Sequence, residues 1–562
     1  MDSLRELFYY KKNMADNPTI SRKTANILTI TDNAKKLLQI IYSEQNKADD
    51  KADLPKIKVS ELISKMAFYY EKIRNSVDYK EEYLLRKNAI ERILKRQLVI
   101  EAAVKEVKPE EIAKHLLVEL IRAAYLPNDS LAETKIDEVA LIINKYIKLR
   151  TLCFKQSGSA SEEKSKTEKW ILSLAASEIE EKLSSNLMVQ KIISDLYQLL
   201  NNNIKFPEQY QKDKEIQIYL GIHSIYLKFD RDMLEFQLLK YFIADWPKGG
   251  DEQISKVANN LASLRQAIDR QINHPLSAQL GKIINQYTVF YTILNDVIAE
   301  DPVKTYENLK EDPKAFQQLI KKFCNRRYKA ASGKLRRAAV RSIIYIFLTK
   351  MILVIILEIP VTLWFGEVLN YTSLGINVSF PPLLLFFIVL FTRVPGDANT
   401  ARIIQGVEEI VYNEKQRQEP YQLRQQAKRS RGVNGVFGFL YAITFFLSFG
   451  LVVWFLDKIH FNFVSILIFL FFLTLVSFFG TRIRKVAREL FVVEHKENII
   501  NLIIDFFFVP VVAVGKWLNE KFSRLNFFVF ILDFIIEAPF KIFVEIVEDW
   551  TKYVKERKEE IV

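Results

Sequence analysis

The chain has 562 residues, a formal net charge of +13 and only 16 glycines. That length is enough for several domains, and the scarcity of glycine argues against strands joined by tight turns. Its two cysteines, Cys153 and Cys324, are too few and too far apart for a disulfide framework or a zinc site. Long stretches rich in Leu, Ile, Lys and Glu indicate helix, and we predict an all-α protein.

The front half of the chain predicts helices with one apolar face. In residues 59–77, apolar side chains recur at intervals of three and four residues, which is the helical period. Residues 108–126 have Pro109 followed by two glutamates, which suits the first turn of a helix. From these patterns we expect three units, which are a cytoplasmic helical block over residues 1–154, a flexible linker over the polar residues 155–168 and a second helical block over residues 169–330.

A basic collar follows at residues 321–341, which carry nine bases and no acid. Two further basic stretches, 393–434 and 481–497, also border apolar segments, and the three stretches together contain the whole positive excess. Because the charge is confined to these borders, it indicates membrane topology, and we exclude nucleic acid as a partner. Clustered cations beside a membrane span also bind anionic lipid headgroups. The candidate headgroup contacts are Arg326, Arg327, Lys334, Arg336, Arg337 and Arg341.

The back half of the chain contains apolar segments that predict four transmembrane helices. They cover residues 342–366, 378–391, 435–456 and 461–480, and the second is short unless the residues before it also enter the membrane. We assign the basic collar and first hairpin to residues 331–395, a cytoplasmic loop with an amphipathic helix to 396–434, the second hairpin to 435–481 and a cytoplasmic segment with interfacial or spanning helices to 482–562.

The loops between these segments predict the orientation. The basic stretches lie on one side and only short loops with a single base lie on the other. By the positive-inside rule, the large front half is cytoplasmic. We therefore predict a polytopic α-helical protein of the cell inner membrane, with a large N-terminal cytoplasmic helical region, a C-terminal transmembrane region, both termini in the cytoplasm, and four to six transmembrane helices.

Residues 499–547 are apolar but interrupted by charge. Asp533, Glu537, Lys541 and Glu545 are four residues apart, so they form one charged stripe on a helix. Three alternatives fit this pattern. The segment is an interfacial amphipathic helix, or it is a helix docked against another span, or it is a pair of spans in which the stripe lines a polar path.

Ionisable side chains at membrane depth are costly, and they are therefore candidates for function. Lys350 and Glu358 lie in the first span, and Asp505 lies in the later apolar segment. Residues eight apart in a regular α-helix are about 12 Å apart along the axis and roughly 80° apart around it, so we do not expect Lys350 and Glu358 to pair within the helix. In one interpretation Lys350 extends to the interface and Glu358 binds a neighbouring helix. In the other, both lie on an ion or substrate path with Asp505.

The sequence lacks the usual catalytic patterns. We find no phosphate-binding loop, no dinucleotide fingerprint, no zinc-protease motif and no serine-hydrolase elbow. The five histidines are scattered singly. We therefore predict no catalytic residue, no metal ligand and no cofactor.

These observations favour a non-enzymatic membrane protein that presents a helical cytoplasmic platform to an unidentified cytoplasmic protein or to a second copy of itself. The motivation is that more than half of the chain precedes the spans. The alternative is an ion channel or small-solute transporter that uses Lys350, Glu358 and Asp505. A third class, a membrane-bound enzyme, would need polar residues that converge near a span end, and the sequence shows none. The lipid bilayer is the one partner common to all three.

Overall fold

We analysed a computed structural model of the chain. The structure describes residues 28–46, 55–78, 84–100, 108–156, 161–184, 186–243, 245–366, 369–425, 430–493 and 499–523, and single residues between 543 and 558.

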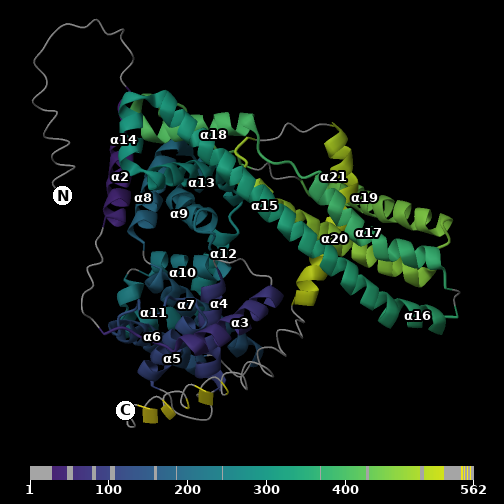
Figure 1. The fold of residues 1–562 in the computed structure, drawn as a ribbon, viewed down its shortest axis with the longest axis horizontal. Coiled ribbons are helices and arrows are strands. Elements are labelled where there is room, and N and C mark those ends of the chain that lie inside the picture. Colours follow the sequence, from purple (N-terminus) through teal and green to yellow (C-terminus); the bar gives the residue numbers. More distant parts are fainter. Residues whose placement is uncertain are drawn as a thin grey trace, which may run out of the picture.

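The described chain forms two parts joined end to end (Figure 1). We call residues 28–328 together with 397–423 the helical body, and residues 335–391, 431–485 and 499–523 the apolar bundle. The prediction of an all-α fold is confirmed, since nearly all described residues outside the connections are helical.

The first core of the helical body draws on residues 57–268. One of its helices begins at the predicted residue, Pro109. Pro109 occupies the first turn of one helix with Glu110 and Glu111 beside it, and Leu116 and Leu120, four residues apart, are fully buried. The helices around this core are α3 (Glu61–Asp78), α4 (Leu85–Lys95) with the π-helical turn η2 (Arg96–Ile100), α5 (Pro109–Arg122), α6 (Thr134–Gln156), α7 (Ser161–Leu183), α10 (Arg231–Phe242), the 3-10 turn η5 (Trp246–Lys248), α11 (Asp251–Asn259) and α12 (Leu261–Ile272).

The second core lies above the first in the view of Figure 1. It gathers fully buried Phe290 and Leu294 with residues from distant parts of the chain, including Ile30 and Val492. Capping residues start its helices: the Asn186 side chain accepts a hydrogen bond from the Val189 N–H. These helices are α2 (Asp32–Gln45), α8 (Leu187–Asn203), the 3-10 turn η4 (Glu208–Asp213), α9 (Lys214–Ile225), α13 (Ser277–Glu300) and α14 (Pro302–Glu311).

Helix α9 joins the two cores. Ile216 and Leu220 belong to the first core, whereas Ile218 and Ile222 belong to the second. Residues two apart lie about 200° apart around a helix, so the two pairs occupy opposite faces. A helix that is apolar on opposite faces is buried between layers, and α9 therefore holds the two cores together.

Most of the segment predicted as a linker is helical. Residues 155–156 end α6, and residues 161–168 form the first turns of α7. Glu162 and Glu163 lie in the first turn of α7, where the helix dipole favours acids, and Thr167 is buried. Tyr146 before this segment and Ile171 after it belong to the same core, so the two cores divide the chain differently from the two predicted blocks.

One helix runs from the helical body into the apolar bundle. Helix α15 (Pro313–Leu353) begins with Asp312, whose side chain accepts hydrogen bonds from the Lys314 and Ala315 N–H groups. It continues through the π-helical turn η6 (Val354–Glu358) into α16 (Ile359–Trp364), which gives an uninterrupted helix of 52 residues. At 1.5 Å per residue this helix is about 78 Å long.

Two other segments return from the bundle to the helical body. Helix α18 (Asp397–Val411) buries Ile403, Val407 and Val411 in the second core. The chain after it passes the 3-10 turn η7 (Asn413–Lys415), and strand β2 (Tyr421–Gln422) pairs in parallel with β1 (Ile204–Lys205). The predicted amphipathic helix in the 396–434 loop is therefore docked on the body. The second returning segment brings Val492 into the same core, where its N–H donates to Asn399 Oδ1 at 2.8 Å.

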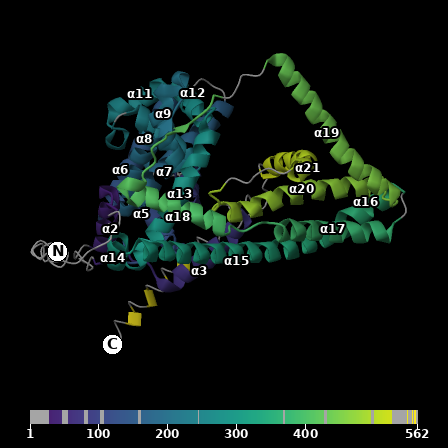
Figure 2. The same ribbon diagram turned by 90° about the horizontal axis from the view of Figure 1, so that it is seen from above.

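The apolar bundle contains α15, α16, α17 (Tyr371–Leu390), α19 (Arg431–Lys458), α20 (Phe463–Arg488) and α21 (Ile499–Ser523). Helix α17 starts at Asn370, whose side chain accepts from Thr372 N–H, so the residues before 378 do extend the short predicted span. Helix α19 meets α20 near the loop that joins them and stands apart at its beginning (Figure 2). Helix α21 runs across α20 and packs on both α19 and α20.

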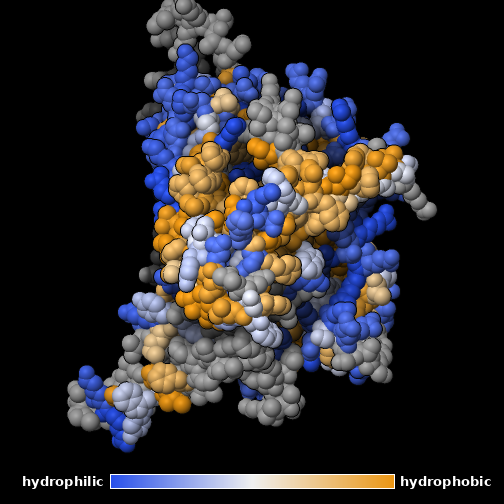
Figure 3. Space-filling model, turned by 90° about the vertical axis from the view of Figure 1, so that its right-hand side faces the viewer, coloured by the Kyte–Doolittle hydropathy of each residue, from blue (hydrophilic) through white to orange (hydrophobic). Residues whose placement is uncertain are grey.

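Apolar side chains cover the outside of the bundle. Seen from its far end, the bundle is largely orange and the helical body behind it largely blue (Figure 3). Ile356, Phe446 and Phe463 are each more than 70% exposed. Among the described residues, four helices are long and apolar enough to cross a membrane, within Pro313–Trp364, Tyr371–Leu390, Gly432–Lys458 and Phe463–Lys485. This arrangement is consistent with an integral membrane protein.

The buried His223 of α9 gives the helical body a pH-dependent stability. Its Nδ1 lies 2.8 Å from the Tyr219 carbonyl oxygen, and its ring packs on the Tyr219 and Phe229 rings. Burial lowers the pKa of His223 from 6.5 to about 4. The unfolded chain therefore binds a proton between these pH values that the folded chain does not, and stability falls as the pH is lowered through this window.

We predict that His223 contributes up to about 3 kcal/mol to the fall in the free energy of unfolding between pH 6.5 and 4. Thermal unfolding of the purified protein in detergent, followed from pH 7 to 4.5, measures this slope. His223→Gln should reduce the slope, whereas His115→Gln, which changes an exposed histidine, should leave it unchanged. Equal slopes in wild type and His223→Gln would contradict the assignment.

Candidate functional site

Lys350 and Glu358 form an ion pair inside the apolar bundle. Lys350 lies on α15 and Glu358 ends the π-helical turn η6, and both side chains are fully buried. The distance from Lys350 Nζ to Glu358 Oε2 is 3.6 Å. The prediction that these residues do not pair within their helix is therefore wrong.

The π-helical turn explains the pairing. A π turn holds one more residue than an α turn, so residues on its two sides are aligned as if they were seven apart. Positions seven apart lie only about 20° apart around an α-helix and about 10.5 Å apart along it. The two long side chains can span that separation. Val354–Glu358 forms this turn between the two charges, and no charge spacing in the sequence signals it.

Two neighbouring helices complete the polar cluster. Glu358 Oε1 accepts a hydrogen bond of 2.5 Å from Asn377 Nδ2 on α17 and one of 3.0 Å from Ser465 Oγ on α20. The Lys350 ammonium lies 4.1 Å from the centre of the Phe472 ring, also on α20. One carboxylate thus connects the long helix to α17 and α20. Sequence analysis missed Asn377 and Ser465 because single amides and hydroxyls in apolar segments give no distinctive pattern.

Several polar atoms of this cluster lack hydrogen bonds. Lys350 Nζ, Glu358 Oε2 and Asn377 Oδ1 are buried without a hydrogen-bond partner among the described residues. A buried polar group without a partner is unfavourable, and a buried charge more so. The cluster can hold the three helices in one register. Both charged side chains are fully buried by the described residues, so the cluster is not in contact with solvent.

The other predicted site residues lie elsewhere. Asp505 on α21 is exposed and lines a separate cavity with Arg484 and Arg488, so it is not part of the Lys350–Glu358 cluster. The charged stripe of Asp533, Glu537, Lys541 and Glu545 lies outside the described residues.

The collar residues all lie on α15, but they differ in environment. Arg327 forms two hydrogen bonds, of 2.6 and 2.7 Å, with the Asp296 carboxylate on α13, and it therefore fastens α15 to the helical body. The other five candidate headgroup contacts have exposed side chains. They are Arg326, Lys334, Arg336, Arg337 and Arg341.

The helical body contains a second buried ion pair beside a cavity of about 640 Å³. Lys145 Nζ on α6 lies 2.5 Å from Glu178 Oε1 on α7, and the Tyr146 hydroxyl donates to Glu178 Oε2 at 2.8 Å. Burial lowers the pKa of Lys145 and raises the pKa of Glu178, against the opposing effect of their attraction. Sequence analysis missed this pair because its members come from different helices. Perturbed ionisable groups beside a cavity mark a candidate binding site.

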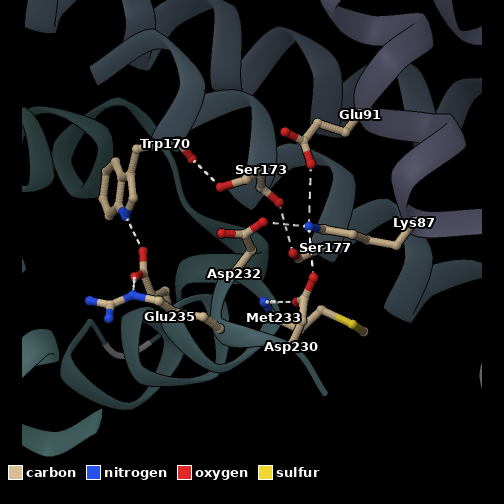
Figure 4. A network of polar contacts seen from close by, with 10 residues as sticks. Lys87, Glu91, Trp170, Ser173, Ser177, Asp230, Asp232, Met233 and Glu235 are labelled. Carbon is tan, nitrogen blue, oxygen red and sulfur yellow. Dashed lines mark hydrogen bonds and ion pairs between the residues drawn. The ribbon is translucent and has the colours of Figure 1, made fainter. Parts of the chain in front are cut away.

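A third charged cluster is structural. The Lys87 ammonium on α4 is enclosed by Glu91 at 3.2 Å, Asp230 at 3.1 Å and Asp232 at 2.6 Å (Figure 4). Burial alone would lower the pKa of Lys87, but the three carboxylates together raise it. The lysine therefore stays charged and ties α4 to the start of α10. Nearby, Trp170 Nε1 donates to Glu235 at 2.7 Å.

The described residues contain no group of three or more His, Cys, Asp or Glu side chains able to hold a metal ion. Burial raises the pKa of the Cys324 thiol to about 11, so this cysteine in the basic collar is protonated at neutral pH. Comparison with known proteins found no matching protein family, curated protein or solved structure.

We predict that Lys350→Met and Glu358→Gln each destabilise the bundle by about 3 kcal/mol, because each leaves a buried polar partner unpaired. The double variant should be more stable than the sum of the single effects implies. Unfolding of the purified variants in detergent measures the coupling energy in a double-mutant cycle. Strictly additive effects would show that the two side chains do not interact.

Proposed function

We propose that this protein is a non-enzymatic integral protein of the cell inner membrane whose helical body acts as a cytoplasmic platform for a protein partner or a second copy of the chain. The apolar bundle anchors it, with both termini and the basic stretches on the cytoplasmic side. The platform is the largest part of the described chain.

The observation that carries this proposal is the way in which the body is attached. Helix α15 enters the second core with Phe316, Ile320 and Cys324, α18 returns to the same core, and Val492 joins it after α20. A body that served only as a tethered cargo would need one connection. Three packed connections instead fix one orientation of the body relative to the bundle, which a docking platform requires.

The cavity beside Lys145 supports a partner site on the body. Leu141 lines this cavity and is 71% exposed, and Leu187, one turn before the lining residue Gln190, is 60% exposed. Apolar side chains at the edge of a charged groove are typical of protein interfaces, in which apolar anchors are surrounded by polar residues. We place the partner at this groove.

The collar supports the placement at a membrane surface. Arg336, Arg337 and Arg341 are exposed on α15 directly before its apolar segment. Cations at this position are attracted to anionic headgroups by about 1 kcal/mol each.

A transporter or channel is the second candidate, and the buried Lys350–Glu358 pair favours it. The pair is sealed by Asn377, Ser465 and Phe472, so conduction would require the helices to separate. The platform proposal expects no ion flux in liposomes that contain the purified protein, and a flux abolished by Glu358→Gln would favour the transporter.

We predict that a photo-crosslinking amino acid at Leu141 captures a specific protein, or a second copy of the chain, in membranes of intact cells. The side chain is exposed, so the replacement should not disturb the fold. The matched control carries the same amino acid at Val303, an exposed residue of α14. Mass spectrometry of the adducts tests the proposal, and identical adducts at both positions, or none at Leu141, would contradict it.

A further inference from the structure

A second cavity lies where α20 leaves the apolar bundle. Its volume is about 330 Å³, and it is formed by the last turns of α20 and one face of α21. The lining side chains are Thr481, Arg484 and Arg488 from α20, and Asp505, Phe508, Val509, Val512, Ala513 and Lys516 from α21.

The lining has two chemical halves. Arg484, Arg488 and Lys516 supply three positive charges and Asp505 one negative charge, so the lining side chains carry a net charge of +2. Lys516 also lies 3.8 Å from Glu520 in an exposed ion pair. The α21 side supplies an apolar wall of one phenylalanine, two valines and an alanine. Arg484 and Arg488 on α20 thus face an apolar α21 wall that has Asp505 at one end and Lys516 at the other. This combination suits an amphiphile with an anionic head.

One of the cavity's arginines is held by a neighbouring helix. Arg484 donates its Nε–H to the Ile388 carbonyl oxygen at the end of α17, at 3.4 Å. Within the described chain, the terminal amino groups of Arg484 make no further hydrogen bond. Arg488 and Asp505 are the charged side chains that act on Arg484 most closely.

A close helix contact fixes the apolar half. A Cβ atom at Gly515 would lie 2.0 Å from the Thr474 carbonyl oxygen, so the α21 backbone touches the α20 backbone there. This contact holds α21 across α20 (Figures 1 and 2). The cavity therefore lies between the basic end of α20 and the apolar face of α21.

We propose that this cavity binds the phosphate-bearing headgroup of an anionic membrane lipid. The arginines and Lys516 contact the phosphate oxygens, and the α21 wall contacts the glycerol and the first carbons of the acyl chains. Asp505 limits the site to ligands of low negative charge. The inference rests on the membrane placement in the proposed function, but it concerns residues distinct from the collar and needs no protein partner.

Native mass spectrometry of the full-length protein in detergent tests this proposal, with phosphatidylglycerol and phosphatidylcholine as probes. Wild type should bind phosphatidylglycerol more tightly. Arg488 and Lys516 are exposed, so the double variant Arg488→Gln/Lys516→Gln should fold, and it should bind phosphatidylglycerol about 10- to 30-fold more weakly. The matched control, Lys304→Gln/Lys310→Gln at two exposed positions of α14 in the helical body, removes the same number of charges and should not change phosphatidylglycerol binding.

Asp505→Asn supplies a change of opposite sign, because it removes the one negative charge. It should tighten phosphatidylglycerol binding about 5-fold. Inorganic phosphate and glycerol 3-phosphate are added as competitors. Failure of both to displace the lipid identifies a lipid site, whereas displacement by either at equal concentration would show that the cavity takes a free phosphate and would overturn the lipid assignment.

Equal binding of the two lipids, or equal loss in the cavity variant and the α14 control variant, would also overturn the proposal. These outcomes are independent of the platform hypothesis, because lipid binding is measured without a protein partner. Conversely, a missing crosslink at Leu141 leaves the lipid measurement intact.

Discussion

The helix from Pro313 to Trp364 packs into the second core of the polar-surfaced body at one end and against α17 and α20 of the apolar bundle at the other. A helix satisfies its backbone hydrogen bonds internally, so it can pass from water into apolar surroundings without exposing unpaired groups. Any break in it would expose such groups at the boundary. The arrangement of the rest of the protein depends on this continuity, because α18 and the segment around Val492 reach the second core only if the body lies close to the end of the bundle.

The continuity has one local irregularity, and it lies at the polar cluster. The π-helical turn η6 brings Glu358 into line with Lys350, and the carboxylate then binds Asn377 and Ser465 on two other helices. Burying an ion pair is costly, and apolar residues of the same size would often be more stable. The cluster as a whole favours one register, since a shift of α17 or α20 would remove the Asn377 or Ser465 hydrogen bond to the buried carboxylate. The long helix thus determines where the body lies relative to the bundle, and its π turn determines how α17 and α20 align with it.

Features that depend on local sequence pattern can be predicted from the sequence alone. The all-α class, the four apolar helices and the start of α5 at Pro109 follow from periodicity, apolar length and capping residues. The amphipathic helix predicted within residues 396–434 also corresponds to α18 and its buried face.

The remaining features depend on contacts that local pattern does not encode. Lys350 and Glu358 meet because a π turn changes the angle between them around the helix. Regular α-helix geometry predicts that they do not pair. Lys145 and Glu178 meet across two helices. Each of the two cores contains residues from before and after the predicted linker, and α9 presents one apolar face to each core. The position of Asp505 beside Arg484 depends on the close contact at Gly515.

The central claim is that the body and the bundle form one rigid unit through α15. Double electron–electron resonance tests it most directly, by measuring the distance between spin labels at Gln318 and Tyr345, which are both exposed on α15. The native Cys153 and Cys324 are replaced by alanine. The labels lie 27 residues apart, so an unbroken helix predicts one narrow distribution near 40 Å in liposomes, at about 1.5 Å per residue. A broad or two-peaked distribution would show that the helix bends or breaks at the collar, and would contradict the claim.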